Sequence, residues 1–280
     1  MNEQFGKQFE LAAGSVTGSQ HRLTGKNNQD AFYSLRTPSA TIAVVCDGCG
    51  SGTHSEVGAK LGARLVVGAI AQLLARSDEP SPWSTEDFWQ QVQQQVLNQL
   101  HPLADQMGGC TAQTIGEYFL FTIVGTLLTP TAAVVFSLGD GIMVVNGQVF
   151  QSGPFPNNAP PYLAYKLLNS SLSKIEIFQI QVQHHLPIDQ VETILIGTDG
   201  VIDLMQFAEK NLPGKSEPVG PLKQFWQEER YFRNPDAIRR RLALINRATM
   251  QPNWQEHRLI KQSGLLQDDT TLVAIRRCKH

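Results

Sequence analysis

Short apolar stretches rich in β-branched residues alternate with polar, glycine-containing segments along the chain. The clearest stretch is 40–46, Ala-Thr-Ile-Ala-Val-Val-Cys, which predicts a buried strand that ends at Asp47-Gly48. Between later stretches, Gly139-Asp140-Gly141 and Asn146-Gly147 are turn signals, and Asn-Gly is a strong signal for a hairpin. Further strands are predicted at 9–16, 31–35, 119–128, 132–138, 142–145, 148–150, 174–180, 193–198 and 268–275.

Two longer segments repeat an apolar residue every fourth position and therefore predict amphipathic helices at about 53–75 and 85–101. Thr53-x-x-Glu56 matches a capping box at the start of the first helix. Shorter helices are predicted after 201 and over 236–248, with 254–261 as a helical continuation. The apolar positions of the two long helices are Val57, Leu61, Leu65 and Ala69, then Phe88, Val92, Val96 and Leu100.

The order of these elements favours an α+β fold, because the helices fall between runs of antiparallel strands instead of alternating with them one for one. A chain of 280 residues can bury a complete core as one domain, and we treat residues 1–280 as a single domain. The segment 211–221 is rich in Pro, Gly, Lys and Glu, and it predicts an exposed insertion within 205–235.

Composition narrows the class of protein. The net charge of −2 argues against a broad surface for nucleic acid. Because we find no apolar run near membrane-span length and no signal-peptide pattern at the N-terminus, we expect a cytoplasmic protein without a membrane partner. Four cysteines are too few for a disulfide scaffold of this length. Cys46-x-x-Cys49 is half of a zinc motif, and no second pair follows it.

Aspartates stand at the ends of several predicted strands. If strand ends on one rim bring these carboxylates together, their repulsion requires cations or bound protons. Oxygen ligands suit Mg²⁺ or Mn²⁺, and a carboxylate shared between two such ions would hold them about 3.5–4 Å apart and activate a bridging water for attack on phosphorus. The alternatives left open are simple Asp-Gly turns and a structural calcium site. The residues are Asp30, Asp47, Asp140, Asp199 and Asp268 or Asp269.

Other motifs are incomplete. Gly48-x-Gly50-x-Gly52 follows a strand, but its spacing differs from the dinucleotide-binding fingerprint, and no lysine follows as in a phosphate-binding P-loop. There is no Gly-x-Ser-x-Gly nucleophile motif. His184-His185 is predicted to lie in a loop before Leu186-Pro187.

The ordered set of motifs resembles the metal-dependent protein phosphatases of the type 2C family, in a bacterial form, from about Gly14 to Ile275. The motifs that carry the resemblance are Asn28-Gln-Asp-Ala31, Val45-Cys-Asp-Gly-Cys-Gly50, Gly125-Thr126, Leu138-Gly-Asp-Gly141, Gly197-Thr-Asp-Gly200 and Asp268-Asp-Thr-Thr-Leu-Val273. The resemblance implies two antiparallel sheets packed face to face with helices outside each. It implies hydrolysis of phosphoserine or phosphothreonine in proteins, with a cognate kinase as a further partner.

The resemblance also assigns ligands for two or three Mn²⁺ or Mg²⁺ ions. Asp47 would bridge two ions, with the Gly48 carbonyl on one of them. Asp199 and Asp268 would complete the other ion, and Asp268 is preferred because the family usually has Asn at the position of Asp269. Asp30 would act through a water, and Asp140 would hold a third ion.

Four departures from the family pattern leave the activity open. Cys49 stands where many members have a histidine proposed as general acid, and a thiol of ordinary pKa near 8.5 is a poor acid for this step. Gly25 stands where the family has its phosphate-binding arginine, which leaves Arg22 or Lys26 as the nearest substitute. Gln29 replaces a glutamate, and Gly141 stands where serine is common. A catalytically weak or inactive pseudophosphatase that binds a partner is therefore the alternative, and a phosphatase for a small phosphometabolite is a third.

Overall fold

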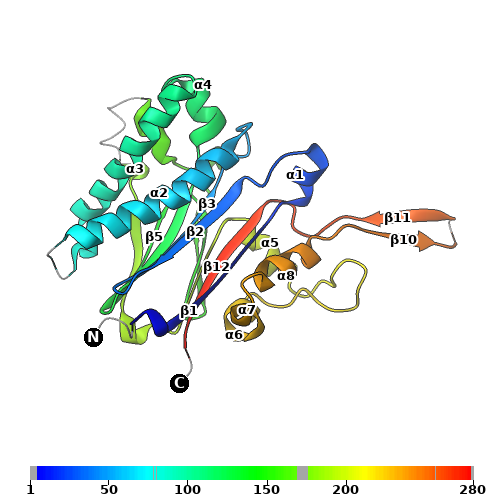
Figure 1. The fold of residues 1–280 in the computed structure, drawn as a ribbon. Coiled ribbons are helices and arrows are strands. Elements are labelled where there is room, and N and C mark those ends of the chain that lie inside the picture. Colours follow the sequence, from blue (N-terminus) through cyan, green and yellow to red (C-terminus); the bar gives the residue numbers. More distant parts are fainter. Residues whose placement is uncertain (1–4, 78, 80, 169–175, 256, 279–280) are drawn as a thin grey trace.

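Two five-stranded antiparallel sheets pack face to face, and helices cover the outer side of each (Figure 1). The structure is a computed structural model, and it describes residues 5–77, 79, 81–168, 176–255 and 257–278. Sheet I contains, in spatial order, β1 (Phe9–Val16), β12 (Thr270–Arg277), β9 (Thr193–Gly197), β6 (Gly141–Val145) and β7 (Gln148–Ser152). Sheet II contains β2 (Asp30–Arg36), β3 (Thr41–Asp47), β4 (Ile123–Leu128), β5 (Ala132–Leu138) and β8 (Gln181–Pro187).

The helices complete a four-layer sandwich, and the predicted α+β architecture with two packed sheets is confirmed. Sheet II is covered by α2 (Ser55–Arg76) and α3 (Glu86–Gln106), which is followed by the short α4 (Ala112–Thr114). Sheet I is covered by α5 (Val201–Gln206), α6 (Gln224–Gln227), α7 (Arg230–Arg233) and α8 (Ala237–Ile245). Beside them, α1 (Ser19–Thr24) precedes β2, and β10 (Thr249–Asn253) pairs with β11 (Arg258–Gln262) in a hairpin that projects from the body (Figure 1).

The alternation along β3 explains how one strand serves two cores. Ile42, Val44 and Cys46 pack in the cluster between sheet II and its helices, whereas Ala43 and Val45 pack in the cluster between the two sheets. Because side chains alternate across a strand, the next residue in phase with Val45 is Asp47, and its carboxyl group enters the space between the sheets. The strand therefore delivers an acid to the end of the sandwich.

Several local predictions are wrong. The capping box does not form: His54 is the N-cap of α2, it makes no side-chain cap bond, and the Glu56 carboxylate instead accepts a hydrogen bond from Asn27 at 2.7 Å. The helix predicted at 254–261 is half of the β10–β11 hairpin. Of the strand predicted at 174–180, residues 174–175 lie outside the described part, and Glu176–Phe178 is a 3-10 turn. The strand in this region begins later, as β8 (Gln181–Pro187). His184 and His185 lie within β8 and not in the predicted loop.

The 205–235 segment is exposed only in part. Its middle, at Lys215 to Glu217, faces solvent. Its flanks supply Leu212, Val219 and Tyr231 to the core between sheet I and its helices, where each is at most 2 % exposed. The segment is therefore anchored at both ends instead of being a free insertion.

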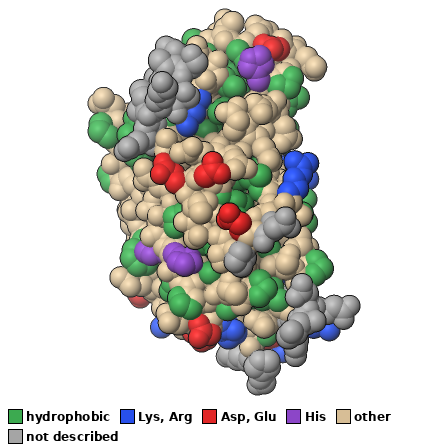
Figure 2. All heavy atoms as spheres, turned by 90° about the vertical axis from the view of Figure 1, so that its left-hand side faces the viewer, with side chains coloured by type: hydrophobic (Ala, Val, Ile, Leu, Met, Phe, Trp, Pro, Cys, Tyr) green, Lys and Arg blue, Asp and Glu red, His purple; other side chains and the backbone are tan. Residues whose placement is uncertain are grey.

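Among the described helices, α2 has the length and apolar composition of a membrane span, which differs from the sequence expectation. In this fold α2 packs on β2, β3 and α3, and its Ala59, Ala63 and Ile70 are fully buried. Its neighbour α3 presents Gln90, Gln91 and Gln94 to solvent. Figure 2 shows the side of the molecule on which α3 lies, where charged side chains stand apart among uncharged atoms.

Candidate metal centre and active site

A cavity of about 510 Å³ lies at the end of the sandwich where β3 and β9 finish. Four of the predicted acids line it from four separate segments, together with Gly48. The other lining groups include side chains that the sequence did not single out, among them a histidine and two tyrosines. The lining residues used below are Asp47, Gly48, Asp140, Asp199, Asp268, His21, Gln29, Cys49, Thr122, Tyr162 and Tyr165.

Asp47 and Asp30 are opposite each other in the antiparallel pairing of β3 with β2, so their side chains lie on the same face. Burial raises the pKa of both carboxyl groups well above the ordinary value, and neighbouring carboxylates raise both further. The buried Asp30 does not line the cavity; its Oδ2 accepts a hydrogen bond of 2.7 Å from the Thr198 hydroxyl. Asp30 is therefore buried beside Asp47 on the neighbouring strand and does not line the cavity.

Asp199 and Asp140 reach the cavity from sheet I. Asp199 follows β9, and burial, followed by the charges of Asp268 and Asp140, raises its pKa to about 6. Asp140 lies in the turn before β6, and burial raises its pKa as well. Burial is the main cause of these raised pKa values, and neighbouring carboxylates add to it at Asp47 and Asp199, while the described lining holds no lysine or arginine.

Asp268 and Asp269 have different surroundings. Asp269 is 2 % exposed, and it accepts backbone N–H bonds from Gly18 at 2.6 Å and Gln29 at 2.5 Å. His21 Nδ1 lies 2.9 Å from Oδ2 of the same carboxylate. The Asp268 side chain is 59 % exposed and lines the cavity. Asp268 therefore faces the cavity, whereas Asp269 is buried against backbone N–H groups.

His21 is the cavity residue that sequence reasoning missed. Its ring is 15 % exposed and lies between the two acids, with Nε2 4.0 Å from Asp268 Oδ1. The nitrogen of His21 and one oxygen from each acid are mutually close enough to share one ion. The available signal was the polar segment 17–29, which had to lie beside the acids because it leads directly into Asp30.

The two Asp-Gly pairs need glycine for a shared reason. A Cβ at Gly48 would lie 2.8 Å from the backbone oxygens of Gln29 and Ser55. A Cβ at Gly200 would lie 2.0 Å from the Asp269 carbonyl oxygen. Any other residue would force these backbones apart. Both glycines therefore hold the loops of the cavity together, whereas Gly50 has open space around its Cβ position.

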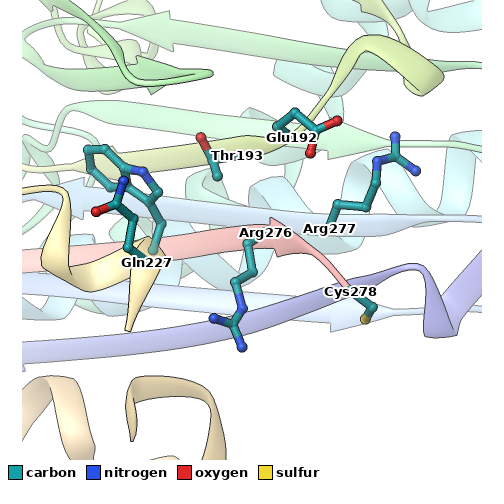
Figure 3. Close-up of a pocket in the computed structure, with 7 residues that line it drawn as sticks. Glu192, Thr193, Gln227, Arg276, Arg277 and Cys278 are labelled. Atoms are coloured by element: carbon teal, nitrogen blue, oxygen red, sulfur yellow. The ribbon is translucent and has the colours of Figure 1, made fainter. Parts of the chain in front are cut away.

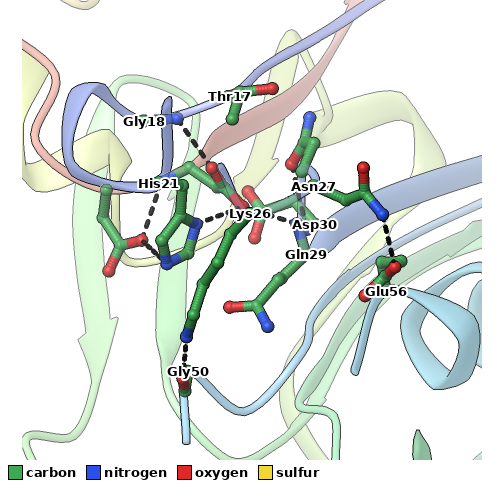
Figure 4. A network of polar contacts seen from close by, with 12 residues as sticks. Thr17, Gly18, His21, Lys26, Asn27, Gln29, Asp30, Gly50 and Glu56 are labelled. Atoms are coloured by element: carbon green, nitrogen blue, oxygen red, sulfur yellow. Dashed lines mark hydrogen bonds and ion pairs between the residues drawn. The ribbon is translucent and has the colours of Figure 1, made fainter. Parts of the chain in front are cut away.

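The two predicted phosphate-binding residues, Arg22 and Lys26, lie in different positions relative to the cavity. The Arg22 guanidinium donates to the Asn246 carbonyl at 2.5 Å and does not line the cavity. Lys26 donates to the Gly50 carbonyl at 2.7 Å, so its ammonium lies beside the cavity loop (Figure 4).

Cys49 does not have the ordinary pKa assumed from sequence. Burial opposes the shift, yet hydrogen bonds from Ser51 and Tyr162 lower the pKa of the Cys49 thiol.

A second cavity of about 480 Å³ lies near the far end of β12 and serves as a contrast (Figure 3). It is lined by Arg276 and Arg277, but these guanidinium groups are already occupied. Arg276 is paired with Glu10 and Glu229, and Arg277 donates to the carbonyl oxygens of Val191 and Ile188. These contacts hold β12 to its neighbours. The arginines that line this cavity therefore stabilise the fold and are not available to a ligand.

The acid-lined cavity fits a hard divalent cation. Its candidate donors are carboxylate oxygens and the Gly48 carbonyl, the ligand types that Mg²⁺ and Mn²⁺ prefer. Within the described residues, the buried oxygens Asp30 Oδ1 and Asp199 Oδ1 have no hydrogen-bond partner. Buried carboxylate oxygens are costly to leave unpaired, and cations would remove that cost.

The comparisons with known proteins agree with this arrangement. The family model described as protein phosphatase 2C matches residues 17–242. No curated protein sequence matches the chain. Three solved structures of similar fold are a bacterial serine phosphatase, the serine/threonine phosphatase Stp1 from Staphylococcus aureus and a serine-threonine phosphatase 2C from Toxoplasma gondii.

These likenesses span almost the whole of both chains at low identity. The bacterial serine phosphatase is 16 % identical with a TM-score of 0.56, covering 97 % of this chain and 99 % of that one. Stp1 is 16 % identical with a TM-score of 0.52, covering 97 % and 96 %. The Toxoplasma gondii protein is 15 % identical with a TM-score of 0.51, covering 97 % and 95 %. The structures show the shared fold, and the family model spans most of the sequence; the chain belongs to the protein phosphatase 2C family.

Proposed function

We propose that this chain is a Mn²⁺- or Mg²⁺-dependent phosphatase that removes phosphate from phosphoserine or phosphothreonine in proteins. The observation that carries the proposal is the convergence of Asp47, Asp140, Asp199 and Asp268 on one cavity. Their charge is not balanced by a described lysine or arginine in the lining. Membership of the protein phosphatase 2C family supports phosphate ester hydrolysis as the reaction.

In this proposal the carboxylates hold two or three cations. Asp47, at the end of β3, and the Gly48 carbonyl beside it would be the ligands shared by this centre. Asp199 and Asp268 would hold one of the ions, Asp140 would hold a third, and Asp30 would support Asp47 from the neighbouring strand. When bound, the ions would supply Lewis-acid activation of the phosphate and of the water that attacks it.

The chain's own side chains orient the substrate around that centre. Lys26, held beside Gly50, is the cation we propose for the phosphate, as a point charge. Tyr162 and Tyr165 line the same cavity and offer aromatic rings and hydroxyl groups to a substrate. Arg22 is dropped from this role because its guanidinium is held at Asn246, which does not line the cavity, whereas Lys26 is held at Gly50, which does.

The test is hydrolysis by protein that has been stripped with chelator and then titrated with Mn²⁺ or Mg²⁺. We expect wild-type protein to hydrolyse p-nitrophenyl phosphate and a phosphothreonine peptide only with metal. We expect Asp47→Asn to lower kcat/KM by about 1,000-fold or more, since a metal centre is worth several kcal/mol. Asp189→Asn, an exposed aspartate outside the cavity, is the matched control and keeps full activity. Metal-dependent hydrolysis that survives unchanged in Asp47→Asn would overturn the proposal.

One observation favours a second candidate, a pseudophosphatase. The described lining contains no arginine, and Arg22 is turned away from it. Calorimetric titration with Mn²⁺ separates the two candidates: an inactive chain that also fails to bind Mn²⁺ supports the pseudophosphatase. Our further proposals, a phosphorylated protein as partner, a cognate kinase that supplies it and a cytoplasmic location, follow from the proposed reaction.

A further inference from the structure

The 249–262 hairpin, made of β10 and β11, stands away from the sandwich with both strands uncovered (Figure 1). It carries four of the large apolar side chains that the protein exposes: Trp254 is 81 % exposed, Met250 65 %, Leu259 62 % and Ile260 44 %. A two-stranded hairpin on its own is only marginally stable in water. Apolar side chains gathered on such an element point to an interaction surface.

The strand register places Met250 and Leu259 on one face of the hairpin and Ile260 on the other. Met250 pairs with Lys261, and Pro252 pairs with Leu259. Because opposed residues and residues two apart share a face, these four lie together. The opposite face carries Ile260 and Gln262. We name Met250, Pro252, Leu259 and Lys261, with Trp254 in the turn beyond them, the hairpin face.

The hairpin is basic on an acidic protein. Segment 249–262 contains two basic residues and one acidic residue, so its net charge is +1, and the rest of the chain carries −3. A partner that suits the hairpin face is therefore apolar with acidic neighbours. A second copy of the chain would bring a like-charged hairpin against it, which charge repulsion disfavours.

The root of the hairpin is fixed beside the acid-lined cavity. Asn246 is fully buried, donates to the Thr17 carbonyl at 2.8 Å and accepts from Arg22. Thr17 lies just before α1, and Arg22 lies within α1 next to His21. Gln262, the last residue of β11, is six residues from Asp268, so the two Cα atoms are at most about 22 Å apart. The five residues of β11 extend the face by about 17 Å more.

We propose that the hairpin face is a docking surface for the phosphorylated protein substrate. It binds a segment with apolar side chains flanked by acidic ones, about 6–12 residues from the phosphorylated residue, the span set by the distances above. This inference rests on the proposed phosphatase function. Docking raises the local concentration of the phosphorylated residue at the cavity, so it acts on KM and not on the chemical step.

The test compares two phosphothreonine peptides that share the phosphorylated core and an eight-residue spacer. One ends in a leucine- and glutamate-rich segment, and the other has serine and lysine at those positions. Each is made with the segment on either side of the core, because the direction of binding is part of the outcome. p-Nitrophenyl phosphate, which is too small to reach the hairpin, reports the catalytic centre alone.

In the double variant Trp254→Ser/Leu259→Ser, we expect KM for the leucine- and glutamate-rich peptide to rise about tenfold with kcat unchanged. Activity on the other peptide and on p-nitrophenyl phosphate stays the same, which also reports correct folding. The matched control is Ile260→Ser, on the opposite face of the same strand, and it leaves all KM values unchanged. Lys261→Glu should raise KM for the acidic peptide only.

Equal KM values for both peptides in wild type and double variant would overturn the inference. So would hairpin-dependent binding to phosphatidylglycerol vesicles, or hairpin-dependent dimerisation in sedimentation, without any effect on the peptide. If wild-type protein fails to hydrolyse p-nitrophenyl phosphate, the proposed function has failed instead. Fluorescence anisotropy of the labelled peptides then measures docking without turnover, and the double variant gives the same comparison.

Discussion

Strand β12 has clustered carboxyl groups near both ends, and the two clusters are built in opposite ways. At the start of the strand, Asp269 is held by backbone N–H groups and His21, and Asp268 faces a cavity with three further aspartates. At the far end, Glu10 and Glu229 converge on the single side chain of Arg276, which is 6 % exposed. One cluster lacks a lysine or arginine partner in its described lining, and the other is built around an arginine.

The difference appears in the direction of the pKa shifts. Hydrogen bonding to Arg276 lowers the pKa of Glu229. Burial and mutual repulsion raise the pKa of Asp47 and Asp199. A paired cluster stabilises the fold when it is ionised, whereas an unpaired cluster destabilises it until protons or cations arrive. The contrast separates a structural ion pair from a site that is made for a ligand.

The largest stability effect is expected when Asp269 and its neighbour Asp268 are substituted one at a time and compared. Asp269→Asn puts an amide group where the carboxylate accepted two backbone N–H bonds and faced His21, which should cost about 2–4 kcal/mol of unfolding free energy. Asp268→Asn, on an exposed side chain, should change stability by less than about 0.5 kcal/mol and instead weaken Mn²⁺ binding. Urea denaturation and calorimetric titration of both variants check this. Equal stabilities of the two variants would remove the distinction between a structural and a ligand-facing aspartate.

Asp199 gives the pH dependence of the unpaired cluster. Its pKa of about 6 lies above the ordinary value of 3.8. The metal-free folded state therefore binds more protons than the unfolded state between about pH 4 and 6, and stability falls as pH rises through that window. Asp199→Asn should stabilise metal-free protein by about 1–2 kcal/mol at pH 8 and by almost nothing at pH 3.5. Urea denaturation in chelator at both pH values measures the difference, and a variant less stable than wild type at pH 8 would contradict it.

Adding Mn²⁺ should reverse this order. Wild-type protein gains stability by mass action when it binds the ion, and Asp199→Asn gains less because it has lost a ligand. A thermal unfolding series with increasing Mn²⁺ checks the reversal. Parallel gains in both proteins would place the ion away from Asp199.

How far the sequence predicted this cluster follows from strand alternation. Asp47 was predictable because Ala43 and Val45 share its phase and are buried, which fixes where its carboxyl group points. Asp268 and Asp269 were harder, since a strand that begins with two acids sends them to opposite faces. Only the structure shows that Asp269 shares the phase of Val273 and Ile275 and lies inside. The position of His21 could not be predicted, because the segment that carries it has no repeating pattern of apolar residues.

The sequence predictions failed where tertiary pairing overrides local pattern. In 254–261, the spacing of Trp254, Leu259 and Ile260 is compatible with a helix, but these residues are exposed and the register with β10 decides the conformation. Strand β8 is an edge strand with mostly exposed positions and a register shift opposite Val135 and Phe136, so it lacks the apolar alternation that marks a half-buried strand.

The paired cluster should show a smaller effect with the opposite pH dependence. Arg276→Met keeps much of the side-chain volume and leaves Glu10 and Glu229 partly exposed, so water can solvate them. We expect a modest loss of stability at pH 7. That loss shrinks as pH falls, because protonated Glu229 no longer gains from the arginine. Thermal unfolding of variant and wild type between pH 3.5 and 7 measures the trend, with Mn²⁺-dependent hydrolysis of p-nitrophenyl phosphate unchanged. A loss that grows toward low pH would show that the two clusters do not differ as described.

The smallest effect concerns Cys49, in the loop between Asp47 and α2. Its thiol contacts the Ser51 hydroxyl at 3.1 Å and is hydrogen-bonded to Tyr162, and these contacts lower its pKa. These contacts occupy the Cys49 sulfur within its own loop and the cavity wall, which gives Cys49 a packing role in place of that of a proton donor. We therefore expect Cys49→Ala to change kcat by less than about threefold on a phosphoserine peptide, well under the 10²–10⁴-fold contribution of a general acid.

p-Nitrophenyl phosphate is the control substrate for Cys49→Ala, because its leaving group departs readily without a proton. If Cys49 does protonate the leaving alkoxide, the variant loses activity on the phosphoserine peptide and retains it on p-nitrophenyl phosphate. If Cys49 is only a packing residue of the loop, both substrates change by the same small factor. The ratio of the two rates therefore assigns the proton donor independently of any general weakening of the metal centre.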